Sequence, residues 1–342
     1  MILKNKTVLI TGGTGSLGKE LVRRIMTGKF GTPKKVIVFS RDEDKQYQMK
    51  LEWKNMKVAT DDVFYHNFEE LIDFRIGDVR DFESITRSIK QSDIVIHAAA
   101  LKQIPVCEYF PHESVKTNLL GVQNIIRSII ENETCVETVI ALSTDKACKP
   151  VNVYGMCKAI QERLVIEANL RCTNTKFICA RYGNVVASRG SVIPLFQEQI
   201  RNGGPVTITV KEMTRFLLTL DQATQIIFDA LRHGESGATY IPILNAFNVM
   251  DLAEVLVGNK KVDIKLVGIR PGEKIHEILV SEEELSRTIK KGNYYVINPI
   301  LPELRPSEVS KPVLNKELSS ADRTLSKKDL KDFLEKEGLL KF

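Results

Sequence analysis

The chain lacks long hydrophobic runs, because its apolar segments are short and charged residues interrupt them. A membrane-spanning helix needs roughly 20 consecutive apolar residues, and no segment provides them. The first six residues, MILKNK, also lack the apolar stretch of a cleavable signal peptide. We therefore expect a cytoplasmic protein that does not insert into a membrane.

Cysteine patterns typical of metal sites are missing as well. None of the six cysteines forms a C-x-x-C pair, and we expect reduced thiols with no metal bound. They are Cys107, Cys135, Cys148, Cys157, Cys172 and Cys179. A concentrated basic segment is missing too, since 49 dispersed lysines and arginines against 43 acidic residues give a net charge of +6. This favours an anionic small molecule over nucleic acid as the ligand.

What the chain does have, near its start, is a glycine-rich turn after a short apolar run. Residues 7–11 (TVLIT) predict a buried strand, and Gly13, Gly15 and Gly18 match the G-x-G-x-x-G spacing of a dinucleotide-binding turn. Glycine lets the backbone approach a pyrophosphate, whose charge is stabilised by N–H groups at the start of the helix expected over 18–26. The residues expected to bind the dinucleotide here are Gly12, Thr14, Gly15, Ser16, Leu17 and Gly18.

The end of the next expected strand, residues 35–40, indicates which dinucleotide binds. An NAD enzyme places a carboxylate on the adenosine ribose at this point, whereas this chain has Arg41. A guanidinium can form paired hydrogen bonds with a 2′-phosphate, so Arg41 predicts NADP. Asp42, directly after it, weakens the prediction. Lys45 is either a second phosphate contact or a solvated side chain.

Further along the chain, apolar strands alternate with helical stretches. This pattern predicts βαβ units, a parallel sheet and a Rossmann-type doubly wound α/β fold. The 342 residues, 43% of them hydrophobic, are enough for a sizeable core and one or two domains. Besides those already named, strands are expected at 71–76, 93–97, 138–142 and 176–181.

Residues just after these strands are further cofactor candidates. Asp78, next to Val79, is placed either to accept a hydrogen bond from an adenine amino group or to cap the following helix. The small residues Ala98, Ala99 and Ala100 either permit close approach of the cofactor or pack tightly. We expect His97 to be a core residue without a chemical role.

Titratable residues gather after the strand at 138–142. Thr144, Asp145 and Lys146 follow it directly, at the sheet edge where α/β enzymes bind ligands. Tyr154 and Lys158 come next, at positions i and i+4 of an expected helix, so the ammonium lies on the face that carries the phenol. A nearby cation stabilises a phenolate, which makes Tyr154 a candidate base. A pair on the helix surface is the alternative.

Several segments along the chain form a specific combination. They are 11–18, 98–105 (AAALKQIP), 143–147 (STDKA), Tyr154 with Lys158, 181–194 (RYGNVVASRGSVIP), 213–216 (MTRF) and 270–274 (RPGEK). Together they resemble the UDP-N-acetylglucosamine 4,6-dehydratases, most closely the soluble, inverting type, which belong to the polysaccharide biosynthesis proteins of the extended short-chain dehydrogenase/reductase superfamily. The resemblance runs from about residue 5 to about 298 and implies a bacterial surface-glycan enzyme with a Rossmann-type sheet and a smaller C-terminal substrate-binding lobe.

The resemblance also implies a mechanism that begins and ends with NADP in its oxidised form. Tyr154 would take the proton of the sugar 4-hydroxyl while hydride leaves C4, and Lys158 would hold the phenolate and the cofactor ribose. Lys146, neutral in a desolvated site, would then remove the C5 proton while Asp145 protonates the departing 6-hydroxyl. Hydride would finally return to C6. Thr144 would hydrogen-bond the 4-oxygen.

Other site residues follow from the same resemblance. Lys102 would support the cofactor and the substrate, and Asn118 would position the catalytic helix through its backbone. The UDP-N-acetylglucosamine substrate would be bound by Lys102, Asn184, Arg189, Thr207, Arg215, Arg270 and Glu273. The sequence leaves open UDP or GDP as the nucleotide, and inversion or retention at C5.

We expect an NADP-binding domain at residues 1–185, a nucleotide-sugar lobe at 186–300, partly interleaved with it, and a C-terminal extension at 301–342. The segment 52–70 and the extension are additions to the family pattern. Leu330, Phe333 and Leu334 predict an amphipathic helix in the extension. The resemblance implies a homo-oligomer, from dimer to hexamer.

Two other functions stay open. A nucleotide-sugar 4-epimerase or reductase would need Tyr154 and Lys158 but would have no use for Asp145 and Lys146 as an acid and a base. A non-enzymatic NADP-binding sensor would need the glycines and Arg41 alone.

Overall fold

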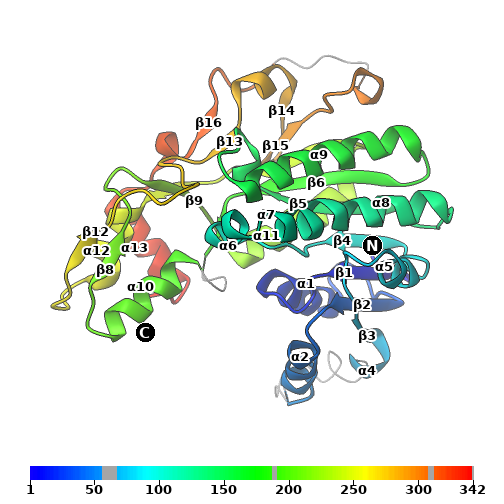
Figure 1. Ribbon diagram of the computed structural model, residues 1–342, viewed down its shortest axis with the longest axis horizontal. Coiled ribbons are helices and arrows are strands. Elements are labelled where there is room, and N and C mark those ends of the chain that lie inside the picture. The colour runs from blue at the N-terminus through cyan, green and yellow to red at the C-terminus, as the bar shows by residue number, and fades with distance from the viewer. Residues whose placement is uncertain (56–67, 187–190, 307–311, 341–342) are drawn as a thin grey trace.

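The computed structural model describes residues 1–55, 68–186, 191–306 and 312–340. Its centre is a nine-stranded sheet in the order β14-β15-β10-β6-β5-β4-β1-β2-β3 (Figure 1). The strands are β1 Thr7–Thr11, β2 Lys35–Ser40, β3 Ile72–Ile76, β4 Ile94–His97, β5 Thr138–Thr144, β6 Lys176–Tyr182, β10 Thr239–Pro242, β14 Thr288–Lys291 and β15 Tyr294–Ile297. All neighbours from β3 to β10 are parallel, and β15 and β14 close the edge antiparallel.

This strand order confirms the predicted Rossmann-type fold. The order reverses at β1, and such a reversal opens a crevice at the carboxyl ends of the strands. Two strands run further than expected, β5 to Thr144 and β6 to Tyr182. The extra pairing of Thr144 with Tyr182 fixes Thr144 at the sheet edge where the crevice lies.

Helices cover both faces because side chains alternate along each strand. Val8 and Ile10 pack into an apolar cluster with α1 (Ser16–Met26) and α11 (Leu220–His233). Leu9 belongs to a second cluster on the other face. The helices of that face are α5 (Phe82–Ile89), α8 (Gly121–Glu131) and α9 (Val153–Arg171). The sheet is therefore buried on both sides, as parallel sheets usually are.

A smaller lobe, at the left of Figure 1, has its own apolar cluster. Its helices are α10 (Val192–Arg201), α12 (Val249–Val257) and α13 (Lys327–Lys336), and its strands β7 (Asn184–Val185), β8 (Val206–Ile208), β9 (Thr214–Leu218), β11 (Ala246–Asn248) and β12 (Ile264–Leu266). The predicted C-terminal helix is confirmed as α13, whose Leu330 and Leu334 are buried in this cluster.

The C-terminal segment also adds a short strand. Strand β16 (Leu318–Ser319) pairs antiparallel with β13 (Ile278–Val280). Because β10, β14 and β15 belong to the main sheet, residues of sheet and lobe alternate along the chain, and the expected domain boundaries stay a prediction. Of the expected insertion at 52–70, residues 56–67 lie outside the described part.

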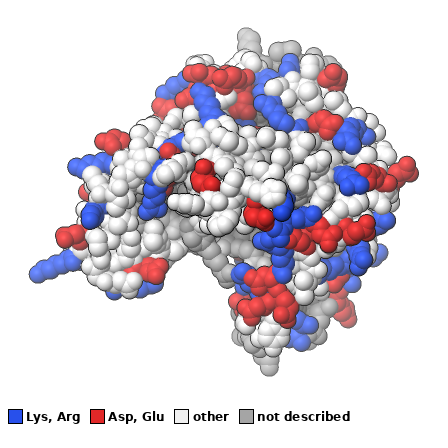
Figure 2. All heavy atoms as spheres, in the orientation of Figure 1, with Lys and Arg blue, Asp and Glu red and all other residues white. Residues whose placement is uncertain are grey.

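The remaining elements connect these layers. They are α2 (Glu43–Asn55), α4 (Phe68–Leu71), α6 (Ile104–Tyr109), α7 (Pro111–Val115), the π-helix η1 (Lys116–Leu120) and the short turns η2 (Asp145–Ala147), η3 (Glu282–Arg287), η4 (Pro302–Leu304) and η5 (Ser320–Arg323). Within the described residues, no helix is long and apolar enough to cross a membrane. Basic and acidic side chains are interspersed on the face shown in Figure 2.

Candidate active site

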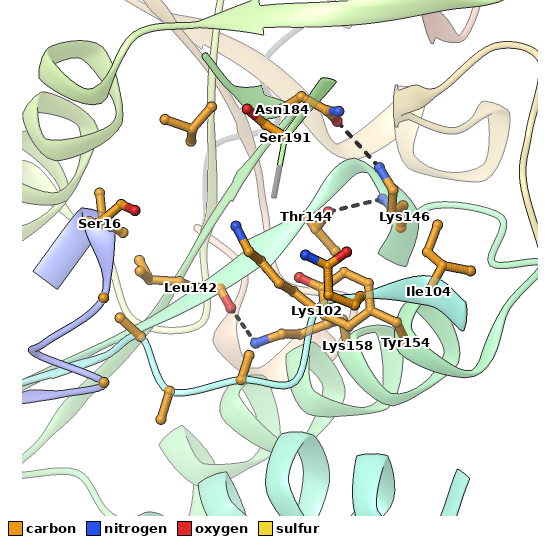
Figure 3. Close-up of a pocket in the computed structure, with 18 of the residues that line it drawn as sticks. Ser16, Lys102, Ile104, Leu142, Thr144, Lys146, Tyr154, Lys158, Asn184 and Ser191 are labelled. Atoms are coloured by element: carbon orange, nitrogen blue, oxygen red, sulfur yellow. Dashed lines mark hydrogen bonds between the residues drawn. The ribbon is translucent and has the colours of Figure 1, made fainter. Parts of the chain in front are cut away.

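A cavity of about 1120 Å³ lies at the carboxyl ends of the parallel strands and reaches the smaller lobe (Figure 3). It brings together most of the residues predicted for the cofactor, the chemistry and the sugar. Those that line it are Gly12, Thr14, Gly15, Ser16, Leu17, Gly18, Arg41, Asp78, Val79, Ala98, Ala99, Ala100, Lys102, Thr144, Lys146, Tyr154, Lys158, Asn184, Thr207, Arg215, Arg270 and Glu273. Asp145 and Asn118 are buried near its wall, and Arg189 lies outside the described residues.

Two glycines of the turn, Gly12 and Gly18, have no room for a side chain. A Cβ on Gly12, whose φ is +68°, would come within 2.9 Å of the Ala99 backbone. A Cβ on Gly18 would come within 2.5 Å of Gly13, which explains the close packing of helix α1 against the turn. Gly15 caps α1 without a side-chain hydrogen bond, so backbone N–H groups face the cavity at this helix end. The arrangement fits a pyrophosphate group.

The adenosine end of the cavity contains two charge pairs. Arg41 is half exposed, with Nη1 3.8 Å from Asp78 Oδ2. Lys45 forms an ion pair with Asp42, so the carboxylate that weakened the NADP prediction has a cation beside it. The interpretation of Asp78 as a helix cap is wrong, because the carboxylate of Asp81 caps α5. Asp78 instead accepts hydrogen bonds from Arg80, whose charge helps to lower the pKa of Asp78 against the effect of burial.

The loop after β4 is fixed from behind by Asn118. Its side chain accepts from the Leu101 N–H and donates to the Leu101 carbonyl oxygen, both at 2.8 Å, which holds the loop that carries Ala98 to Lys102. His97 is buried, as expected for a core residue, and its Nδ1 lies 2.8 Å from Thr11 Oγ1. Burial and the charge of Lys158 lower the pKa of His97 to about 3, so this imidazole is neutral.

Helix α9 places Tyr154 in the cavity wall and Lys158 below it (Figure 3). The Asn152 side chain starts the helix by accepting from the Gly155 N–H at 2.7 Å. Lys158 is buried and donates to the Leu142 carbonyl oxygen and to Gln161 Oε1, both at 2.9 Å. Burial lowers the pKa of Lys158 to about 8.

Lys146 is a cation near Tyr154 that was not expected to act on the phenol. Burial raises the pKa of Tyr154 to about 12, and the charge that opposes this rise is that of Lys146. The hydrogen bonds of Lys158 go to Leu142 and Gln161. Stabilisation of the phenolate by Lys158 stays a prediction, whereas the influence of Lys146 on Tyr154 was missed from the sequence.

Lys146 lies between two buried carboxylates. Its Nζ is 3.0 Å from Asp145 Oδ1, 2.9 Å from Glu277 Oε1 and 3.3 Å from Asn184 Oδ1. Burial alone would lower the pKa of Lys146, but the charges of Asp145 and Glu277 raise it. The contacts therefore favour the ammonium form of Lys146 and not the neutral amine expected from the sequence.

The two carboxylates differ from each other. Asp145 is fully buried, and burial raises the pKa of Asp145 although Lys146 opposes the rise. Burial alone would also raise the pKa of Glu277, but the charges of Lys146 and Arg215 lower it below its usual value. Asp145 Oδ2 and Glu277 Oε2 have no hydrogen-bond partner within the described residues. The site thus holds one amine between two carboxyl groups, of which Asp145 has a raised pKa and Glu277 a lowered one.

Glu277 was not predicted. It stands directly before the apolar residues 278–280, and a charged residue beside such a run is the only local signal. Arg215 lines the cavity, and its guanidinium donates to the carbonyl oxygens of Thr214, Lys274 and Ile275. These bonds fix the segment before Glu277.

The remaining substrate candidates surround the lobe side of the cavity. Glu273 accepts from Thr209 Oγ1 at 3.2 Å, and Arg270 is exposed. Thr207 is held by Gln199, which donates to its hydroxyl at 2.8 Å. The described residues contain no group of three or more potential metal ligands.

The chain belongs to the polysaccharide biosynthesis protein family, whose model matches residues 8–299. It is 43% identical over 299 residues to a UDP-glucose 4-epimerase of Rickettsia bellii, covering 86% of this chain and 83% of that protein. The solved structure of Pen from Bacillus thuringiensis is 32% identical with a TM-score of 0.86, covering 98% of this chain and 99% of Pen. A dTDP-glucose 4,6-dehydratase from Streptomyces venezuelae, solved with NAD bound, shares the fold at 20% identity and a TM-score of 0.66, covering 79% of this chain and 86% of that one.

Proposed function

We propose that this protein is an NADP-dependent 4,6-dehydratase that converts UDP-N-acetylglucosamine to a UDP-2-acetamido-2,6-dideoxy-hexos-4-ulose, with inversion at C5, for bacterial surface glycans. One observation carries the proposal. Lys146 lines the same cavity as the Tyr154 and Lys158 pair, and its Nζ lies 3.0 Å from the buried acid Asp145. Removal of water from a sugar needs both an acid and a base, in addition to the group that oxidises C4.

NADP would be held by the glycine turn, Ala98 to Ala100 and Lys158, with Arg41 at the 2′-phosphate. When bound, it supplies hydride chemistry at C4 and C6. The Arg41 side chain is 50% exposed at the cavity rim, which leaves it accessible to a phosphate group. Arg41→Ala should weaken NADP roughly tenfold or more and NAD little, as measured by titration calorimetry. Equal loss for both cofactors would contradict this assignment.

The residues of this chain divide the chemistry among them. Thr144 holds the 4-oxygen, and Tyr154 accepts the 4-hydroxyl proton as C4 is oxidised. The ketone at C4 acidifies the C5 proton, which Lys146 removes once it is neutral. Asp145, whose pKa is raised by burial, gives a proton to the departing 6-hydroxyl.

The nucleotide sugar would lie between the sheet edge and the smaller lobe. Asn184, Thr207, Arg270 and Glu273 are placed along this side, and Lys102 extends into the cavity from the loop after β4 (Figure 3). Arg189, outside the described residues, stays a candidate for the diphosphate. Arg215, whose hydrogen bonds go to backbone carbonyls, would contribute its charge. We also propose a cytoplasmic homo-oligomer, which sedimentation analysis would test.

A 4-epimerase is the second candidate, favoured by the name of the Rickettsia relative. An epimerase returns hydride to C4 and needs no acid or base for a second bond. Incubation with UDP-N-acetylglucosamine followed by mass spectrometry separates the two, because only a dehydratase product is lighter by one water. An unchanged mass with an inverted C4, seen by NMR, would establish the epimerase. GDP-N-acetylglucosamine as a parallel substrate tests the nucleotide.

A further inference from the structure

Glu277 has the geometry of a proton acceptor for Lys146. Its side chain is 2% exposed, and its Oε1 lies 2.9 Å from Lys146 Nζ. On the other side, Asp145 Oδ1 lies 3.0 Å from the same nitrogen. Lys146 therefore bridges two carboxyl groups, and only one of them is needed as the acid of the proposed reaction.

The C-terminal segment fixes Glu277 from behind. The Glu277 N–H donates to Ser320 Oγ at 2.9 Å, and the Ser320 N–H donates to the Glu277 carbonyl oxygen at 2.9 Å. Ser320 is fully buried, and its hydroxyl also lies 2.7 Å from Thr214 Oγ1. The backbone at Glu277 is thus held by two hydrogen bonds from a segment beyond the family match, which ends at residue 299.

We infer that Glu277 accepts the ammonium proton of Lys146 and so frees the amine to act as a base, and that Ser320 positions Glu277 for this transfer. The inference rests on the proposed function and deepens it. Lys146 can remove a C5 proton only as a free amine, whereas its contacts with two carboxyl groups favour the ammonium form. The reaction therefore needs an acceptor for this proton, and the proposed reaction already uses Asp145 as the acid.

The proton steps balance. First, one N–H bond of Lys146 breaks and an O–H bond forms on Glu277. The amine then takes the C5 proton, and the electron pair of the C5–H bond forms the C5–C6 double bond. The C6–O bond breaks as Asp145 protonates the leaving hydroxyl. Glu277 is now protonated and Asp145 ionised. A proton passing from Glu277 through Lys146 to Asp145 returns these three groups to their starting states, and the elimination releases only water. The proton that C5 takes when hydride returns to C6 balances the one that Tyr154 took from the 4-hydroxyl.

The charged groups around this relay come from several elements. They are Asp145 beside Lys146, Tyr154 on α9, Arg215 on β9 and Lys274 before β13. Arg215 Nε lies 3.9 Å from Glu277 Oε1, which favours the ionised form of Glu277 that a proton acceptor must have at the start.

The test is Glu277→Gln in the full chain with NADP and UDP-N-acetylglucosamine, followed in single turnovers. Reduced-nicotinamide absorbance reports C4 oxidation, and mass spectrometry reports loss of water. Oxidation should stay within about threefold of wild type, while elimination at pH 7 falls roughly a hundredfold. Elimination by the variant should then rise with pH, because Lys146 must give its proton to solvent, whereas the wild-type rate stays flat from about pH 7 to 9. Glu277→Asp should recover part of the rate.

Glu284→Gln is the matched control, since Glu284 is a largely buried ion-paired carboxylate that does not line the cavity. Its elimination rate and pH profile should match wild type. Normal elimination by Glu277→Gln would overturn the inference and make Asp145 the acceptor, while the proposed function would stand. A wild-type enzyme that forms no dehydrated product would instead refute the proposed function.

If circular dichroism shows that Glu277→Gln does not fold, Ser320→Ala tests the role of Glu277 instead. It leaves the carboxylate in place but removes the hydroxyl that accepts from the Glu277 N–H. Elimination should fall about tenfold with oxidation unchanged, because a small displacement of a proton-transfer pair slows that transfer alone. An equal loss of both steps, or no loss, would overturn the positioning role.

Discussion

Two buried clusters in this protein place one cation between two carboxylates, and they differ in how completely the cation is satisfied. In the first, Arg181 donates to Glu162 at 2.9 and 2.6 Å, to Glu284 twice at 2.8 Å and to the Leu279 carbonyl oxygen at 2.9 Å. A guanidinium has five N–H donors, so all of them are used. In the second, Lys146 contacts Asp145 and Glu277, and one oxygen of each carboxylate has no partner within the described residues.

This difference separates a structural ion cluster from a reactive one. Arg181 joins β6 to α9 and η3, stays charged at any ordinary pH and does not line the cavity. Lys146 is on the cavity wall, and an amine can lose its proton when its surroundings change. Charge pattern and burial alone would not tell the two apart. The identity of the cation, the unpaired oxygens and the access to the cavity do.

Converting the reactive cluster to the structural type should have the largest effect. Lys146→Arg keeps the positive charge between Asp145 and Glu277, but a guanidinium cannot lose its proton to become a base. We expect elimination to fall roughly 10³- to 10⁴-fold, with C4 oxidation retained, so that reduced-nicotinamide absorbance accumulates in the presence of substrate. Lys149→Arg is the control, because Lys149 is on the same loop but pairs with Glu317 outside the cavity. Release of dehydrated sugar by Lys146→Arg at the normal rate would make Lys146 a structural partner only.

Breaking the structural cluster should instead change folding stability. Arg181→Met leaves Glu162 and Glu284 buried without their cation, and an uncompensated buried charge costs about 3–5 kcal/mol. Urea denaturation would measure the loss of unfolding free energy. Arg171→Met, at the exposed end of α9, should change it by less than about 0.5 kcal/mol. If both variants were equally stable, the Arg181 cluster would not be a structural cross-link.

Most residues of the candidate site could be predicted from the sequence, but the charge state of Lys146 could not. The glycine turn, the alternating strands and the Tyr154 and Lys158 spacing are local patterns, and the structure brings these residues to one cavity. The charge state of Lys146 depends on its neighbour Asp145 and also on Glu277, which is 131 positions further along the chain and stands directly before β13. No local sequence pattern predicts the contact between Lys146 and Glu277.

Other differences have similar causes. The segment 77–81 contains two aspartates, and which of them caps the next helix depends on where the helix starts. It starts at Phe82, so Asp81 is the cap. For the C-terminal segment, apolar spacing predicts helix α13. It carries no information on the contact of Ser320 with Glu277, because that contact is made mainly by backbone groups.

Removal of the phenol separates the oxidation step from the elimination step. Tyr154→Phe should lose at least roughly a hundredfold in turnover while still binding NADP, because the 4-hydroxyl proton then has no acceptor. Unlike Lys146→Arg, this variant should not accumulate reduced nicotinamide. The measurement is stopped-flow absorbance with a parallel titration of NADP binding. Near-normal turnover would remove Tyr154 from the mechanism.

As the pH falls, the contribution to folding stability should decrease for the Arg181 cluster and increase for Asp145. This is the smallest effect we expect. Although burial opposes it, the charge of Arg181 lowers the pKa of Glu284 from 4.5 to about 2. A lowered carboxyl pKa stabilises the folded protein above about pH 4.5, and this stability is lost as the pH falls towards 2. The stability difference between wild type and Glu284→Gln should therefore shrink by about 2 kcal/mol between pH 7 and 3, as measured by urea denaturation.

The pKa of Asp145 is raised by burial, so the folded protein binds this proton more tightly than the unfolded chain. Wild type should gain stability relative to Asp145→Asn as the pH falls through that raised value, and a shift of the same sign in both clusters would mean that Asp145 is held as a carboxylate and cannot be the acid.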